Sequence, residues 1–164
     1  LLTCSTLSPL VPELRDKLDF WIEAVDDAMA KRAVMTGSRI GVLATNPTTL
    51  EPTRRLLLRE ATLGGKRIEI SESLVAGALA DLLAGNGAEH DRRVVQAASD
   101  LAGGVEVIVL AQASMARAQP LLQDLPIPVL ASPRLALESL RSHLERKTQA
   151  QPEEKDDTNG DLTK

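Results

Sequence analysis

The chain has 164 residues, a formal net charge of −4 and 43% hydrophobic residues, enough for one domain or two small lobes. The single cysteine excludes an internal disulfide and a multi-cysteine zinc site. Because the chain also has only two histidines, we expect no metal centre. With one Phe, one Trp, a negative charge and no apolar run near the about 20 residues of a membrane span, we expect no nucleic-acid or membrane partner.

Short apolar runs alternate with longer periodic runs along the chain, which predicts strands alternating with helices. The predicted strands are 1–3, 20–25, 39–44, 67–70, 105–110 and 128–131. The predicted helices are 8–18, 27–36 (capped by Asp26), 50–63, 74–83 (capped by Ser71 or Ser73), 88–101, 115–122 and 134–146. This order predicts an α/β fold with a mostly parallel sheet, covered on both faces because 105–110 (VEVIVL) is almost wholly apolar.

Ligands bind parallel α/β sheets outside the carboxyl ends of the strands, and this rule first selects Cys4 with its neighbours Ser5 and Thr6. Backbone amides and a helix dipole at such a position favour the thiolate, which serves as nucleophile or base. The alternative is an ordinary small core residue. Neither histidine lies in a predicted strand-end loop, so no Cys–His pair is expected.

Two more strand ends carry polar clusters. The hydroxyl-rich loop 45–49 leads into a helix, where free amides suit a carboxylate or small phosphate; the alternative is simple capping by Thr48 or Thr49. Gln112 and Ser114 follow the strand 105–110. Glutamine forms hydrogen bonds but transfers no proton, and the alternative role of Ser114 is to cap the next helix.

Five segments, in this order, resemble the aspartate/glutamate/hydantoin racemase family, and the resemblance runs from Leu1 to about Leu144. They are LLTCSTLSP (1–9), VDDAMAKRAV (25–34), RIGVLATNPTTLEPTRRLLLREA (39–61), VEVIVLAQASMARAQPLL (105–122) and PVLASPRLALESL (128–140). The resemblance implies two pseudo-symmetric lobes with parallel sheets flanked by helices and an active site in the inter-lobe cleft. It also implies a cofactor-independent enzyme with a small carboxylate substrate. We expect a cytoplasmic protein, and homo-oligomers are common in the family.

In this family one cysteine thiolate removes the α-proton of the substrate and a second thiol, from the other lobe, returns a proton. Cys4 matches the first cysteine, which predicts that it is the catalytic base. Ser5 and Thr6 match the polar residues that hold the substrate. Thr45 and Thr48 match the threonines that bind its carboxylate.

The chain departs from the family at the second cysteine, where Ala111-Gln112 stands in place of the usual Gly-Cys pair. Gln112 and Ser114 are predicted to line the wall opposite Cys4. Because the chain has no second thiol, the two-thiol reaction cannot run as written. The first hypothesis is an amino-acid racemase or isomerase with a cysteine base. The alternatives are a one-cysteine decarboxylase or cis–trans isomerase of a dicarboxylic acid, and a non-catalytic carboxylate-binding or decayed homologue.

The resemblance also sets the expected domains. Family members have βα units before the first cysteine, so we expect an N-terminally truncated member with an incomplete first lobe, unstable or inactive when expressed alone. Residues 1–34 are the predicted remainder of that lobe, 35–131 the second lobe and 132–147 a C-terminal helix that packs back on the first. The acidic, pattern-free residues 148–164 predict a disordered tail, with a docking tail as the alternative.

Overall fold

A parallel sheet of four strands forms the centre of the computed structural model, which describes residues 1–150. The strands are β1 (Arg39–Ala44), β2 (Glu69–Leu74), β3 (Val107–Leu110) and β4 (Val129–Ala131). Their order in the sheet is β2-β1-β3-β4, so β1 and β3 occupy the middle. In the register of the sheet, Val42 of β1 lies between Glu72 of β2 and Val109 of β3.

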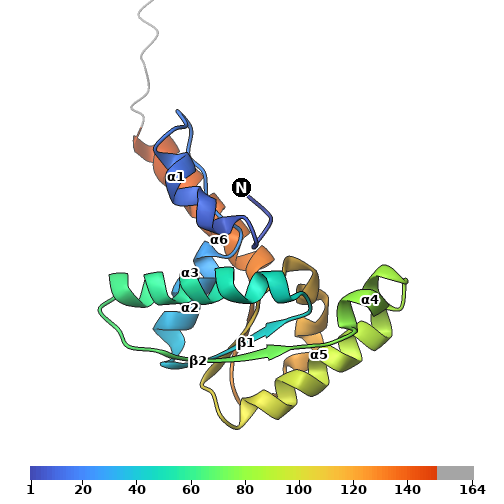
Figure 1. The fold of residues 1–164 in the computed structure, drawn as a ribbon. Helices are drawn as coiled ribbons and strands as arrows, with labels where there is room; N and C mark the ends of the chain where they lie inside the picture. The colour runs from blue at the N-terminus through green and yellow to red at the C-terminus, as the bar shows by residue number, and fades with distance from the viewer. Residues whose placement is uncertain (151–164) are drawn as a thin grey trace, which may run out of the picture.

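Helical segments join the strands and cover the sheet (Figure 1). They are η1 (Ser8–Leu10), α1 (Val11–Arg15), α2 (Asp27–Thr36), η2 (Pro47–Thr49), α3 (Leu50–Leu63), α4 (Ala78–Leu83), α5 (Gly87–Ala102), η3 (Ala113–Leu122) and α6 (Ser132–Ala150). The prediction of an α/β fold with a parallel sheet flanked by helices is confirmed. Within residues 1–150, no helix combines the length and apolar composition needed to cross a bilayer.

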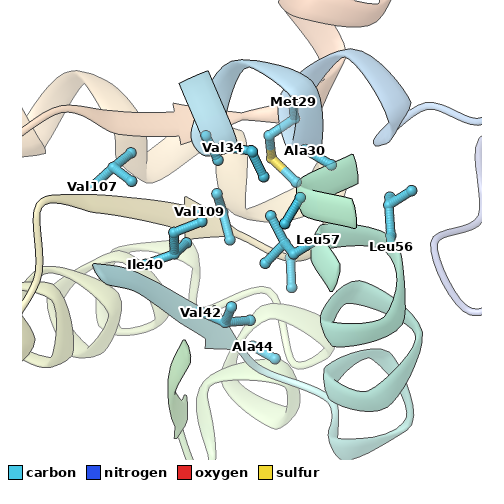
Figure 2. Close-up of a cluster of buried hydrophobic side chains, with 13 residues drawn as sticks. Met29, Ala30, Val34, Ile40, Val42, Ala44, Leu56, Leu57, Val107 and Val109 are labelled. Carbon is cyan, nitrogen blue, oxygen red and sulfur yellow. The ribbon is translucent and has the colours of Figure 1, made fainter. Parts of the chain in front are cut away.

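Two apolar clusters lie on opposite faces of the sheet. On one face, side chains of β1 and β3 point toward α2 and α3, and Val42 shares a cluster with Met29 and Leu57 (Figure 2). On the other face, Leu43, the next residue along β1, packs in a cluster with Val94 of α5. Successive residues of a strand point to opposite faces, so a strand covered on both sides is apolar throughout.

The bounds of β1 and α3 agree with the sequence prediction, because local signals mark both ends of the connection between them. The side chain of Asn46 accepts a hydrogen bond from the amide of Thr48 and caps η2, which leads directly into α3. Glu51 lies in the first turn of α3, where a negative charge is favourable. After α3, Gly65 adopts a φ of +63°, a left-handed conformation that favours glycine.

The N-terminal segment has less regular structure than predicted. The expected strands 1–3 and 20–25 form only a single parallel bridge, between Leu2 and Ala24. The expected helix 8–18 is reduced to η1 and α1. Pro12 has no amide hydrogen to donate to the carbonyl of Ser8, so the α-helical pattern cannot begin there, and Val11 donates to Ser8 in a 3₁₀ turn instead.

The prediction was also wrong around β2. The strand expected at 67–70 extends from Glu69 to Leu74, and the helix expected from residue 74 begins at Ala78. Ser71 and Ser73, expected to cap that helix, pair with β1 inside the strand. The pairing partner is about thirty residues away in sequence, so a local pattern carries no information about where the ladder ends.

The C-terminal helix α6 lies beside the N-terminal segment (Figure 1). The ring of His143 stacks on that of Trp21 with their centres 3.9 Å apart, and the hydroxyl of Ser139 donates to the carboxylate of Glu23 at 2.8 Å. α6 extends to Ala150, four residues beyond the helix predicted at 134–146, so the prediction of disorder was wrong for residues 148–150. The rest of the predicted acidic tail, residues 151–164, lies outside the described residues, and the division into lobes stays a prediction.

Two adjacent leucines of α3 test this packing. Leu57 is fully buried, whereas Leu58 is 42% exposed. We expect Leu57→Ala to lower the free energy of unfolding by about 2–5 kcal/mol, because it removes apolar contacts and leaves a cavity. Leu58→Ala, the matched control, should change it by about 0.5 kcal/mol or less. Urea denaturation measures both, and equal losses would contradict the described core.

Candidate functional site

The ends of the two central strands are joined by one side chain. Gln112, two residues beyond β3, lies beside the loop that follows β1. Its Oε1 accepts hydrogen bonds from the amide of Thr45 at 2.6 Å, from the hydroxyl of Thr45 at 3.1 Å and from the amide of Asn46 at 3.2 Å. The structure therefore brings two predicted site residues, Gln112 and Thr45, into direct contact. The same contact occupies donors that the sequence assigned to an anion.

The remaining polar groups of the 45–49 loop have different roles. The amide of Thr48 donates to the side chain of Asn46 at 3.1 Å, and the hydroxyl of Thr49 donates to the Asn46 carbonyl at 2.8 Å. No side chain caps α3, so the expected alternative of capping by Thr48 or Thr49 is wrong. Thr48 is exposed, and its side chain remains available to a ligand at this edge of the sheet.

Gln112 presents its amide nitrogen away from the loop. Three donors surround its oxygen, which fixes the orientation of the amide group, because the nitrogen cannot accept a hydrogen bond. The residue is half-buried, and the side-chain hydrogen bonds that it forms within residues 1–150 all go to its oxygen. Ser114, two residues further on, is exposed and does not cap η3. This strand end therefore offers N–H and O–H groups and no acid.

The predicted base lies at the surface. Cys4 is exposed, so the alternative of a core residue is wrong. It begins a tight turn in which the amide of Leu7 donates to the carbonyl of Cys4 at 3.0 Å and that of Ser8 to the carbonyl of Ser5 at 3.3 Å. These amides are therefore not free to stabilise a thiolate. The helices that follow, η1 and α1, have three and five residues, so their dipoles are small.

A buried acid that the sequence analysis misassigned supports this turn. Asp26 was expected to cap α2, but its side chain forms no cap. Its Oδ1 accepts a hydrogen bond from the hydroxyl of Ser8 at 2.6 Å, and its Oδ2 is buried with no partner within residues 1–150. Burial raises the pKa of Asp26 above its ordinary value, and the hydrogen bond from Ser8 offsets part of this effect.

The neighbouring acid has the opposite environment. Asp27 is also buried, but its two carboxylate oxygens pair with Arg59 at 2.9 Å and with Arg15 at 3.0 Å. Arg59 also pairs with Glu60. Arg15 and Arg59 are thus used by Asp27 and Glu60, and the one side-chain hydrogen bond of Asp26 among the described residues comes from Ser8.

The Cys4 turn and the 45–49 loop lie toward the same edge of the sheet. α2 leads into the amino end of β1, so its first residues lie near the carboxyl end of that strand, and Asp26 holds the turn there. η1 also contacts α3, the helix that follows the loop. Within residues 1–150, no hydrogen bond joins the turn to the loop, although both lie toward this edge.

A second buried cluster lies in the first turn of α5. The ring of His90 is fully buried, its Nδ1 lies 2.8 Å from a carboxylate oxygen of Asp91, and Arg117 of η3 donates to the same carboxylate at 2.9 Å. The sequence indicated a polar helix here and gave no sign of this burial. In the part of the chain that is described, no three His, Cys, Asp or Glu side chains group as metal ligands do.

Hollows in the surface do not coincide with the predicted residues. A groove of about 730 Å³ runs along the outer edge of β4, between η3 and α6. Two smaller hollows, of about 360 and 420 Å³, lie between α2 and α6 and beside the start of β1. None of the three is lined by Cys4 or by any other predicted site residue. These three hollows therefore lie apart from the candidate site.

The chain was compared with protein-family models and with solved structures. A family model described as Asp/Glu/Hydantoin racemase matches residues 1–140. Glutamate racemase from Bacillus anthracis is 15% identical with a TM-score of 0.64, over 88% of this chain and 56% of that chain. Glutamate racemase from Francisella tularensis subsp. tularensis, solved in complex with D-glutamate, has the same identity, TM-score and coverage.

Allantoin racemase from Klebsiella pneumoniae is 22% identical with a TM-score of 0.60, over 76% of this chain and 50% of that chain. Likeness at these identities shows the fold alone. The chain spans about half the length of these solved racemases. No curated protein matches.

Truncation of Gln112 should destabilise the site edge. We expect Gln112→Ala to lower the free energy of unfolding by about 1–3 kcal/mol, because three donors lose their acceptor. Hydrogen exchange at the amides of Thr45 and Asn46 should accelerate. Gln112→Glu keeps an acceptor and serves as the matched control, with the smaller loss. Wild-type stability and exchange in Gln112→Ala would contradict the described contact.

The environment of Asp26 predicts a pH dependence. Its pKa is higher in the folded state than in the unfolded chain, so the folded state binds the proton more tightly. Stability from this group is therefore complete at low pH and is lost as the pH rises from about 3.9 through the folded pKa. Urea denaturation from pH 3 to pH 7 should show the wild type losing stability relative to Asp26→Asn. A wild type that keeps or gains stability relative to Asp26→Asn as the pH rises contradicts this environment.

Proposed function

The chain belongs to the Asp/Glu/hydantoin racemase family, and from this premise we propose that it is an isomerase acting on a small carboxylate substrate, an amino acid or a derivative of one. The thiolate of Cys4 is the base that removes the α-proton and becomes a thiol, and a water molecule returns a proton to the opposite face of the carbanion. The observations that support the proposal are that the one thiol is exposed and that Thr45 and Gln112 are in contact at the ends of the two central strands. A thiol that acts as a base has to reach its substrate.

The polar groups at this edge have separate roles in the proposal. Removal of an α-proton places negative charge on the substrate carboxylate, and donors that are already in position stabilise this charge. The N–H groups of Gln112 and the hydroxyl of Thr48 are such donors. Thr45 contributes by holding the oxygen of Gln112, and so the orientation of its N–H groups.

The turn around Cys4 supplies the other wall. Thr6 is exposed and contacts the substrate, whereas Ser5 is buried and acts through the turn. The exposed hydroxyl of Ser114 completes the side opposite Cys4. The thiolate itself is the base, so the proposed step needs no cofactor.

The comparisons support this reaction over the alternatives. The solved structures reported above are racemases, and none is a decarboxylase or a cis–trans isomerase. A cytoplasmic location and assembly into homo-oligomers stay predictions.

Exchange of the α-proton into deuterated water tests the proposal. Glutamate, aspartate and hydantoin derivatives are incubated with the protein, and deuterium uptake is followed by NMR. We expect Cys4→Ala to lower the exchange rate by about 10²–10⁴-fold, the usual contribution of a general base. Ser99→Ala, on the exposed face of α5, is the control and should exchange as the wild type does. Equal rates in wild type and Cys4→Ala would overturn the role of Cys4.

A further inference from the structure

A buried carboxyl group lies directly beneath the turn that carries the proposed base. We propose that Asp26 is a positioning residue for Cys4, which holds the 4–8 turn, and with it the thiol, through the hydroxyl of Ser8. The inference deepens the proposed function and rests on it only for the chemical role of Cys4. The sequence suggested a different role for Asp26, as a helix cap, and the structure removes that role.

The geometry around Ser8 shows how Asp26 acts on the turn. The hydroxyl of Ser8 has one proton and two acceptors within reach, Oδ1 of Asp26 at 2.6 Å and the carbonyl oxygen of Cys4 at 3.4 Å. A separation of 2.6 Å is typical of a hydroxyl that donates to an ionised carboxylate. The turn is therefore anchored to the start of α2 through the hydroxyl of Ser8.

Burial of Asp26 without a counter-ion lowers the stability of the folded chain. It is fully buried, and one of its oxygens has no partner among the described residues. The charged groups packed around it do not compensate: Asp27 beside it carries the same charge, and Arg15 of α1 and Arg59 of α3 pair with Asp27. A buried acid without a counter-ion lowers stability, and residues kept at such a cost are typical of functional sites.

The carboxyl group of Asp26 accepts or donates the hydrogen bond with Ser8 according to its protonation. When Asp26 is ionised, it takes the proton of Ser8. When it is protonated, it donates to the Ser8 oxygen, and the Ser8 proton turns to the carbonyl of Cys4. The hydrogen bonds of the turn thus change with the protonation of Asp26.

The pH profile of Cys4 alkylation tests the proposal. The chain has a single cysteine, so iodoacetamide reports on Cys4 alone and needs no turnover. Rates are measured from pH 6 to pH 10 for the wild-type chain, Asp26→Ala, Ser8→Ala and Asp26→Asn. Asp27→Asn is the matched control, because it alters the neighbouring carboxyl and leaves the bond from Ser8 to Asp26. Circular dichroism confirms that each variant is folded.

We expect Asp26→Ala and Ser8→Ala to change the limiting alkylation rate by about threefold or more, because thiol reactivity follows the local environment. Asp26→Asn keeps an acceptor for Ser8 and should restore most of the wild-type rate, whereas Asp27→Asn should match the wild type. Ser8→Ala keeps the test decisive where Asp26→Ala fails to fold. Wild-type profiles in folded Asp26→Ala and Ser8→Ala overturn the proposal. Absence of α-proton exchange in the wild type would overturn the proposed function and leave this result standing.

Discussion

The candidate site depends on one oxygen atom, Oε1 of Gln112, which holds the ends of the two central strands together. It accepts three hydrogen bonds from Thr45 and Asn46, which lie 67 and 66 residues away in sequence. This contact shapes the loop after β1 and points the N–H groups of Gln112 outward. The position that the family resemblance assigns to a second thiol is thus filled by a group that binds and orients, and the proton-transfer chemistry falls to Cys4.

The two adjacent acids at the start of α2 have different roles: Asp27 is structural, and Asp26 is proposed to position Cys4. Asp27 pairs with Arg15 and Arg59 and ties α1 and α3 to α2. Asp26, also buried, accepts its one side-chain hydrogen bond among the described residues from Ser8, and its pKa is raised by burial.

Local signals predicted the parts of the fold that depend on local structure. β1 and α3 match because an apolar run, Asn46, and the glycines after Leu63 mark their ends within a few residues. The end of β2 did not match, since it is set by pairing with β1. The same limit applies to the site. Cys4 and the polar strand ends follow from position in an α/β pattern, whereas the bond from Ser8 to Asp26 spans 18 residues and has no periodic signature.

The central claim is that the Cys4 turn and the loop after β1 form one carboxylate site. Titration of the ¹⁵N-labelled protein with glutamate, aspartate and hydantoin, followed by amide chemical shifts, tests it most directly. The account predicts that, for at least one of these ligands, the amides of Ser5 and Thr6 shift together with those of Thr45 and Thr48, and that all fit a single dissociation constant. Shifts confined to one segment, different constants for the two segments, or no shifts with any of them would contradict it.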